Sequence, residues 1–190
     1  MSERINGDKI IIVAAPSGAG KSSFVERISR EDSRLVDIIT YTTRTQRQGE
    51  SEGHPYHFIT KDDFNHKVET GFFVEYAKVH TNMYGTPWDQ IRLAWSKNKC
   101  VIMDIDVQGT ETFRRKFPQA KTIFILPPSI DELRRRIQKR DAVLPADFEV
   151  RMQNAAKEMA LAHEFNYQII NDDFDRAYAE FKKIVDVLLA

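Results

Sequence analysis

Residues 15–22 read APSGAGKS and directly follow the apolar stretch KIIIVAA at residues 9–15. Glycines let such a backbone curl so that several N–H groups face one anion, and a helix N-terminus adds partial positive charge. In that setting Lys21 can reach the β- and γ-phosphates of a nucleotide, and the Ser22 hydroxyl can bind Mg²⁺. The segment is therefore predicted to be a phosphate-binding loop (P-loop). The alternative, a glycine-rich turn without a ligand, leaves the lysine and the serine unexplained.

Carboxylates at the end of the apolar stretch at residues 100–106 are candidates to bind the metal ion. Asp104 lies toward the carboxyl end of this predicted strand, where it can orient Mg²⁺ beside the P-loop. Asp106 is better suited to cap the helix that follows. We therefore expect Ser22 and Asp104 to hold Mg²⁺, partly through water.

The elements that must position these residues are short apolar stretches alternating with segments of helical periodicity. Stretches such as KIIIVAA are apolar on both faces, which is typical of buried strands in a parallel sheet. This alternation predicts an α/β fold with a five-stranded parallel sheet and helices on both faces. The strands are expected at residues 9–15, 35–39, 100–106, 121–126 and 167–170.

Residues 40–86 break this alternation, being rich in Thr, Gly, His and aromatic residues. Short strands are predicted at residues 56–59 and 73–79, with Thr60 capping a helix between them. We interpret the segment as a small mixed insertion. Further along, Ser129 and Glu132 form a predicted capping box at the start of a charged helix. An irregular stretch at residues 141–147 then separates two charged helices.

The composition limits the class of protein. The chain has 190 residues, 42% hydrophobic and 29% charged, with a formal net charge of zero. These values exclude a disordered chain, and the charge balance disfavours a nucleic-acid polymer or a membrane surface as partner. The single cysteine, Cys100, excludes an internal disulfide, and the five histidines lack metal-site spacing. With no signal peptide and no run of ~18 apolar residues, we expect a cytoplasmic protein.

Several further motifs carry a resemblance to a known family. Residues 40–50 read TYTTRTQRQGE, residues 53–58 read GHPYHF, and FVEYA and YGT follow at residues 73–77 and 84–86. DIDVQG begins at Asp104, and PPS and NDD occur further on. In register from about Lys9 to the C-terminus, the chain resembles the guanylate kinases.

The resemblance implies one domain with three parts. The core is expected at residues 1–39, 87–140 and 152–190, the GMP-binding insertion at residues 40–86 and the lid at residues 141–151. The implied activity is ATP-dependent phosphorylation of GMP, and of dGMP, in purine nucleotide metabolism, with Mg²⁺ as cofactor and ATP and GMP as partners. The positions that the resemblance assigns to ATP are Ala15, Pro16, Ser17, Gly18, Ala19, Gly20, Lys21, Ser22, Ser23 and Asn171.

The GMP positions suit the chemistry of that nucleotide. Guanidinium groups bind phosphate bidentately, which fits Arg44 and Arg47. The carboxylate of Glu75 can accept hydrogen bonds from both the N1–H and the 2-amino group of guanine, and adenine would leave it unpaired. The positions assigned to GMP are Thr40, Arg44, Arg47, Tyr56, Glu75, Tyr84, Thr86 and Asp106.

The resemblance also assigns arginines that close over ATP and stabilise the transferring phosphoryl group. Positioning and charge neutralisation supply most of the catalysis in such a transfer. The lid differs from the family at Asp141, where glycine is usual, and the P-loop has Ala15 in place of its first glycine. The residues expected to act in catalysis are Lys21, Arg44, Arg136, Arg140 and Arg151.

Three other functions remain as alternatives. A guanylate-kinase-like binding module without catalysis would have an eroded P-loop or lacking arginines, whereas Lys21 and Ser22 are present. A kinase for another phosphorylated acceptor, such as a ribose bisphosphate, would not need Glu75. A GTP-binding switch protein is disfavoured because the sequence lacks the Asn-Lys-x-Asp guanine motif. The oligomeric state is not predicted.

Overall fold

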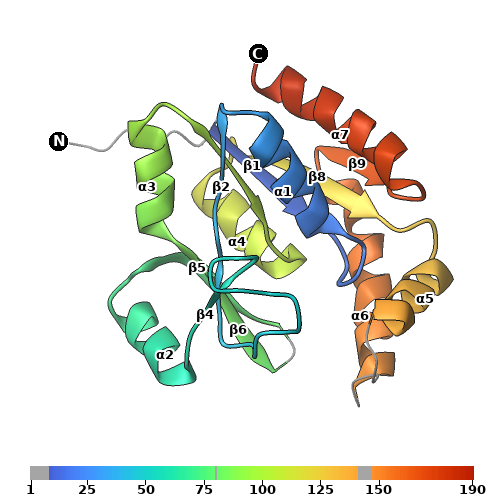
Figure 1. Cartoon of the computed structure of the whole chain (residues 1–190), viewed down its shortest axis with the longest axis horizontal. Helices are drawn as coiled ribbons and strands as arrows, with labels where there is room; N and C mark the ends of the chain where they lie inside the picture. Colours follow the sequence, from blue (N-terminus) through green and yellow to red (C-terminus); the bar gives the residue numbers. More distant parts are fainter. Residues whose placement is uncertain (1–8, 80, 141–146) are drawn as a thin grey trace.

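The computed structural model describes residues 9–79, 81–140 and 147–190, apart from the side chain of Arg140. In this part of the chain the strands form two sheets (Figure 1). The larger sheet has the order β2-β7-β1-β8-β9, and every neighbouring pair is parallel. This confirms the predicted α/β fold. The strands are β1 (Ile10–Ala14), β2 (Leu35–Asp37), β7 (Cys100–Asp104), β8 (Lys121–Leu126) and β9 (Tyr167–Ile170).

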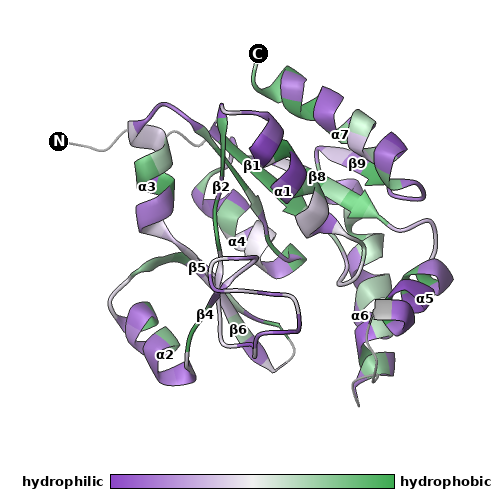
Figure 2. Ribbon diagram, in the orientation of Figure 1, coloured by the Kyte–Doolittle hydropathy of each residue, from purple (hydrophilic) through white to green (hydrophobic). Residues whose placement is uncertain are grey.

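The central strands are apolar on both faces because helices cover both faces. All five residues of β1 are buried, and β1 and β8 are among the most hydrophobic ribbons in Figure 2. Ile11 and Val13 face one core, formed with α1, α5, α6 and α7, while Ile10 and Ile12 face the other, formed with α3 and α4. The helices are α1 (Lys21–Glu31), α3 (Trp88–Ser96), α4 (Val107–Lys116), α5 (Ile130–Arg140), α6 (Phe148–Ala160) and α7 (Phe174–Leu188).

The strand register brings the metal-binding candidates to one edge of the sheet. Val13 of β1 pairs with Asp104 of β7, one residue before the end of β1. The loop that follows β1 therefore begins next to the Asp104 carboxylate. The predicted strand at residues 100–106 ends at Asp104 because Asp106 caps α4, accepting a 2.7 Å hydrogen bond from the N–H of Gly109.

The smaller sheet lies within the expected insertion and has the order β4-β3-β6-β5. β5 matches the predicted strand at residues 73–79, and the helix α2 (Lys61–Glu69) begins after Thr60, whose hydroxyl caps the N–H of Asp63. Two of the four strands were not predicted, namely β3 and β6. The strands are β3 (Tyr41–Thr42), β4 (His57–Phe58), β5 (Phe73–Val79) and β6 (Asn82–Pro87).

The capping box predicted at the start of α5 is half formed. The hydroxyl of Ser129 accepts a hydrogen bond from the N–H of Glu132 at 3.1 Å, as predicted. The carboxylate of Glu132 does not complete the box, because it accepts a hydrogen bond from Arg136 Nε at 2.9 Å instead. The family arginine is thus paired within its own helix.

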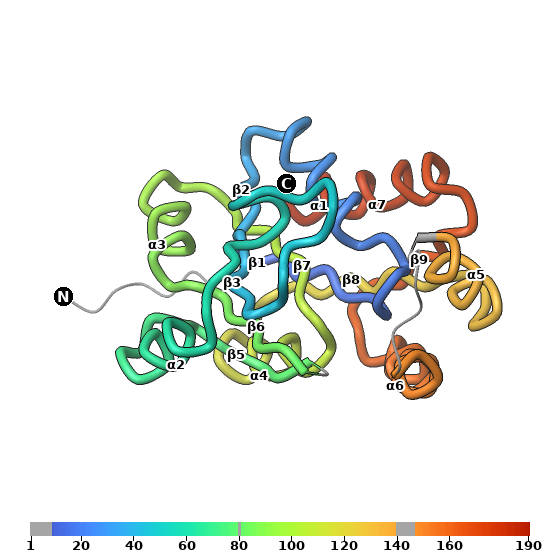
Figure 3. The backbone as a smooth tube through the Cα atoms, turned by 60° about the horizontal axis from the view of Figure 1, so that its bottom comes forward, coloured from blue at the N-terminus to red at the C-terminus, as the bar shows by residue number. Residues whose placement is uncertain are grey.

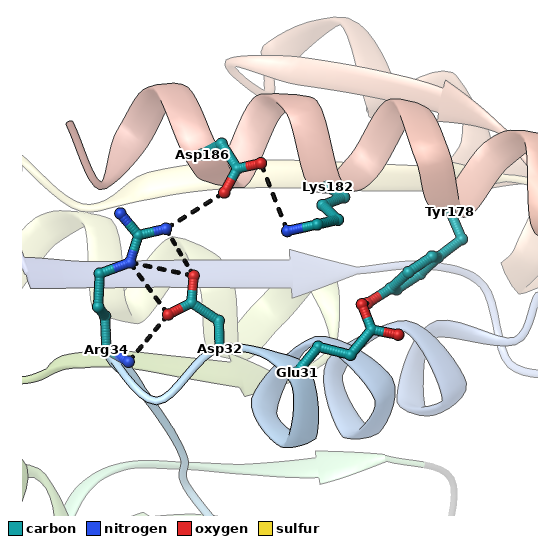
Figure 4. Close-up of polar contacts among 6 residues, drawn as sticks. All are labelled: Glu31, Asp32, Arg34, Tyr178, Lys182 and Asp186. Atoms are coloured by element: carbon teal, nitrogen blue, oxygen red, sulfur yellow. Dashed lines mark hydrogen bonds and ion pairs between the residues drawn. The ribbon is translucent and has the colours of Figure 1, made fainter.

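Polar contacts attach α7 to the end of α1 and the loop before β2 (Figure 4). Arg34 binds the nearly buried carboxylate of Asp32 through Nε and Nη2 and reaches Asp186 of α7 at 3.2 Å. Tyr178 of α7 donates a 2.8 Å hydrogen bond to Glu31. α7 therefore fixes the end of the helix that begins at the P-loop. None of the helices in the described ranges is long and apolar enough to cross a membrane.

Candidate active site

A cleft of about 1040 Å³ lies at the carboxyl ends of the parallel strands. The P-loop and the end of β7 line it, together with residues of the smaller sheet and of α6. Figure 3 shows α6 set apart from the smaller sheet, on the other side of β7. The cleft therefore lies where an open α/β sheet is expected to bind its ligands.

The backbone of the P-loop adopts a conformation that requires its glycines. Gly18 and Gly20 have φ values of 93° and 94°, which strain any other residue. The N–H of Ala19 donates to the carbonyl of Pro16 at 3.0 Å, and α1 begins at Lys21. Ala15 is not among the described residues with positive φ, so alanine fits the position of the family's first glycine. The loop thus presents the start of α1 to the cleft, a suitable place for phosphate.

Ser22 and Asp104 lie together on the floor of the cleft. The Ser22 hydroxyl donates to Oδ2 of Asp104 at 2.5 Å. Burial raises the pKa of Asp104, and the charge of Lys21 and the bond from Ser22 act against this rise. Mg²⁺ prefers oxygen ligands and usually takes only one or two from the protein, the rest coming from water and phosphate. A hydroxyl and a carboxylate on the floor of a phosphate cleft therefore fit Mg²⁺.

Asn171 supports the P-loop from beneath. Its side-chain Nδ2 donates to the carbonyl of Ala19 at 3.0 Å, and its own carbonyl accepts a 2.9 Å hydrogen bond from Arg136. Asn171 and Ala19 are 6% and 0% exposed, and neither lines the cleft. The structure thus shows the side chain of Asn171 bonded to the loop. It joins the P-loop to α5.

The acceptor end of the cleft carries a preorganised arginine. Arg44 donates from Nη1 and Nη2 to the two carboxylate oxygens of Glu50, at 3.0 and 2.8 Å, and its guanidinium lies 5.4 Å from the ring centroid of Tyr56. Tyr84 packs edge-on against Tyr56. Burial raises the pKa of Tyr56 well above its usual value, so its hydroxyl stays a donor. Arg47 is exposed and lines the same end.

Two carboxylates meet at the other end of this pocket. Glu75 and Asp106 both line the cleft, and the α-carbon of Gly109 lies beside them. A Cβ at Gly109 would lie 3.1 Å from Glu75 Oε2 and 3.0 Å from Asp106 Oδ1. Burial raises the pKa of Glu75 to about 7, partly opposed by its bond from Thr86. The fully buried Thr86 thus orients Glu75 and does not itself line the cleft.

Thr40 remains available to a ligand. Its hydroxyl is buried at the cleft and has no hydrogen-bond partner among the described residues. A buried polar group without a partner is costly, so a ligand acceptor or donor at this position would be favoured.

The expected catalytic arginines occupy different places. Arg151 lines the cleft and is held by Asp147 at 2.8 Å. Arg136 points to Glu132 and the carbonyl of Asn171, and it does not line the cleft. The side chain of Arg140 and most of the predicted lid, residues 141–146, lie outside the described residues.

The sequence analysis missed Glu158 of α6, which lines the cleft. Burial raises its pKa to about 7, Asp106 adds to the rise, and Lys21 opposes it. The signal in the sequence was its spacing from Arg151, because residues seven apart lie on one face of a helix.

A P-loop beside a buried carboxylate, facing a pocket with arginine, tyrosine and further buried carboxylates, defines a P-loop kinase. Comparisons with known proteins identify the family. The guanylate kinase family model matches residues 7–188. The chain therefore belongs to the guanylate kinase family.

Individual relatives agree with this assignment. The chain is 65% identical to guanylate kinase from Bdellovibrio bacteriovorus over 96% of this chain and 98% of that protein. It is 44% identical to guanylate kinase from Polaromonas over 93% and 85% of the two chains. The crystal structure of guanylate kinase from Anaplasma phagocytophilum superposes with a TM-score of 0.76 and 28% identity, covering 94% of this chain and 84% of that one.

Proposed function

We propose that the chain transfers the γ-phosphoryl group of ATP to GMP, giving ADP and GDP, and that dGMP is a second acceptor. The observation that carries the proposal is a single cleft that joins a P-loop to a pocket with Arg44 at one end and Glu75 at the other. Arginine suits the acceptor phosphate, and a carboxylate suits the two adjacent donors of guanine. Family membership supports the same activity.

In the reaction an oxygen of the GMP phosphate attacks the γ-phosphorus, and the bond from that phosphorus to the β–γ bridging oxygen breaks. The acceptor oxygen is already anionic, so no general base is required. The chain's task is to bring two anions together and to balance their charge. Lys21, Arg44 and Arg151 supply positive charge from three sides of the cleft. Arg136 and Arg140 complete the proposed catalytic set.

We assign the nucleotide positions as the family resemblance implies. Residues 15–23 and Asn171 form the ATP site, with Asn171 acting through the P-loop carbonyl that it holds. Ser22 and Asp104 would hold Mg²⁺, which supplies charge neutralisation on the β- and γ-phosphates when bound. The GMP site consists of Thr40, Arg44, Arg47, Tyr56, Glu75, Tyr84, Thr86 and Asp106, with Thr86 acting through the carboxylate of Glu75 that it orients.

Three segments would divide the work. We propose a core at residues 1–39, 87–140 and 152–190, a GMP-binding insertion at residues 40–86 and a lid at residues 141–151. Closure of such segments excludes water from the transferring phosphoryl group. The proposed setting is purine nucleotide metabolism in the cytoplasm, with ATP and GMP as partners.

The test is a coupled assay with MgATP and each nucleoside monophosphate. GMP should be the preferred ribonucleotide acceptor, dGMP should be used, and Lys21→Ala should abolish the activity. A preference for AMP, or GMP phosphorylation that survives Lys21→Ala, would contradict the proposal. A binding module without catalysis would bind GMP yet yield no ADP in the same assay.

A further inference from the structure

Glu158 is the acidic residue that α6 contributes to the cleft. Seven residues separate it from Arg151, which also lines the cleft, so the two share one face of α6 about 10 Å apart along its axis. Arg151 provides positive charge for phosphate. Glu158, two helical turns further along, therefore faces a different part of the ligand.

Two charged residues that also line the cleft lie near enough to Glu158 to act on it electrostatically. Its charge interacts with that of Asp106, at the carboxylate end of the acceptor pocket, and with that of Lys21, in the P-loop. Within the described ranges no hydrogen bond or ion pair joins the Glu158 carboxylate to another side chain or to the backbone. Glu158 is partly buried and its carboxylate has no such hydrogen bond or ion pair, whereas other side chains that line the cleft do.

The chemistry of the acceptor limits what a carboxylate can bind there. Phosphate oxygens would repel it, so it needs hydrogen-bond donors. GMP has four donor groups outside its phosphate: the N1–H and the 2-amino group of guanine, and the 2′- and 3′-hydroxyls of ribose. In the proposed site the two guanine donors belong to Glu75 and Asp106. The two hydroxyls remain.

We propose that Glu158 binds the ribose hydroxyls of the acceptor nucleotide. The ribose connects the phosphate to the base, and Glu158 lines the same cleft as the P-loop lysine and the guanine-end carboxylate. Carboxylates commonly accept hydrogen bonds from vicinal ribose hydroxyls. This inference rests on the proposed function and makes Glu158 the residue that determines how strongly GMP is preferred over dGMP.

The experiment compares three acceptors in the MgATP assay: GMP, dGMP and 2′,3′-dideoxy-GMP. Glu158→Ala should raise KM for GMP about tenfold, since hydrogen bonds to a charged group are lost. KM for 2′,3′-dideoxy-GMP should be the same in both proteins, because this acceptor has neither hydroxyl. In Glu158→Gln, KM for GMP should lie between the values of the wild type and of Glu158→Ala, because the amide oxygen still accepts one hydrogen bond. Glu164→Ala, at an exposed carboxylate just beyond α6, is the matched control and should leave every KM unchanged.

Equal increases in KM for GMP and 2′,3′-dideoxy-GMP would overturn the inference. An increase in KM for ATP alone would also overturn it, because Glu158 would then act on the ATP side of the cleft, through Lys21. If Glu158→Ala does not fold, the test uses Glu158→Gln and the wild-type KM values for GMP and 2′,3′-dideoxy-GMP. A ratio near one between these two wild-type values contradicts the inference. Failure of the proposed function looks different, because the wild-type chain would then not phosphorylate GMP at all.

Discussion

Thr86 donates a 2.6 Å hydrogen bond from its hydroxyl to Oε1 of Glu75, and both side chains are buried. The bond comes from the adjacent strand, since Glu75 of β5 pairs with Thr86 of β6. One carboxylate oxygen is thus fixed by the sheet, while Oε2 lies near Gly109 at the cleft. The carboxylate proposed to read guanine is therefore oriented without a ligand.

Removing this hydrogen bond should weaken GMP use. Thr86→Val keeps the shape of the side chain but takes away the donor, so Glu75 loses its orientation. A hydrogen bond to a charged group contributes about 2 kcal/mol, so KM for GMP should rise ten- to thirtyfold, with KM for ATP unchanged. Thr122→Val, at a buried threonine of β8 that bonds to Asn166, is the control for stability. Equal KM values for GMP in the wild type and Thr86→Val would refute the orienting role.

GMP binding should strengthen as pH rises. Burial raises the pKa of Glu75 to about 7, and only the ionised carboxylate accepts both guanine donors. Between pH 6 and pH 8 the ionised fraction grows about tenfold, so affinity should grow by a similar factor and binding at pH 6.5 should release a proton. Calorimetry in two buffers of different ionisation enthalpy measures that proton.

The control for the pH effect is Glu75→Gln. The GMP phosphate itself titrates near pH 6, and this contribution remains in the variant. The steep part of the pH dependence and the released proton should disappear in Glu75→Gln. A variant with the same pH profile as the wild type would mean that Glu75 does not read guanine.

Gly109→Ala should separate binding from stability. Within α4 alanine is favoured over glycine by about 1 kcal/mol, so the melting temperature should hold or rise. The new methyl group would lie 3.1 Å from Glu75 Oε2 and 3.0 Å from Asp106 Oδ1, which forces both carboxylates to move. KM for GMP should rise at least fivefold, measured beside thermal unfolding. A more stable variant with an unchanged KM for GMP would refute the close approach of Gly109 to the two carboxylates.

Asn171→Asp should impair the ATP side selectively. The substitution removes the donor that holds the carbonyl of Ala19 and places a negative oxygen against it. KM for ATP should rise at least tenfold through the loss of a buried hydrogen bond and the new repulsion, while GMP binding without ATP stays normal. Asn65→Asp, at an exposed position in α2, is the control. A larger effect on GMP than on ATP would contradict this role.

Asp37→Asn should stabilise the protein at neutral and alkaline pH. Burial and the nearby charges of Asp104 and Glu26 raise the pKa of Asp37 from 3.8 to about 7. The unfolded chain therefore ionises first, so the free energy of unfolding falls between about pH 4 and pH 7 and is level above. The variant should exceed the wild type by about 4 kcal/mol at pH 8 and match it near pH 4, in urea unfolding. Asp62→Asn, on the exposed side of α2, should show no such difference.

The parallel sheet could be predicted from the sequence because its strands are apolar on both faces. The strands at residues 121–126 and 167–170 begin and end as predicted, and β1 differs by one residue at each end. β6 was not predicted because Gly85 and Pro87 are unfavourable in strands. It forms through pairing with β5 and β3, which a local pattern cannot reveal.

The candidate site could be predicted where a motif is local and continuous. The P-loop is such a motif, and the structure brings Ser22 to Asp104 across 82 residues. The direction of each arginine could not be predicted. Arg136 bonds to Glu132 within α5, but it also donates to the carbonyl of Asn171, which lies far along the chain. Glu158 was missed because its spacing from Arg151 shows only that the two residues share a face of α6. The tertiary packing of α6 is what places that face at the cleft.

The bond between Asn171 and Ala19 has a consequence for how the chain is made. Translation delivers the P-loop early, but the amide that supports it follows 152 residues later. Domains form as units while the nascent chain emerges. A nascent chain that ends before Asn171 would therefore contain the whole P-loop motif and still lack a firm nucleotide site, so that the proposed ATP site forms only after Asn171 has been made.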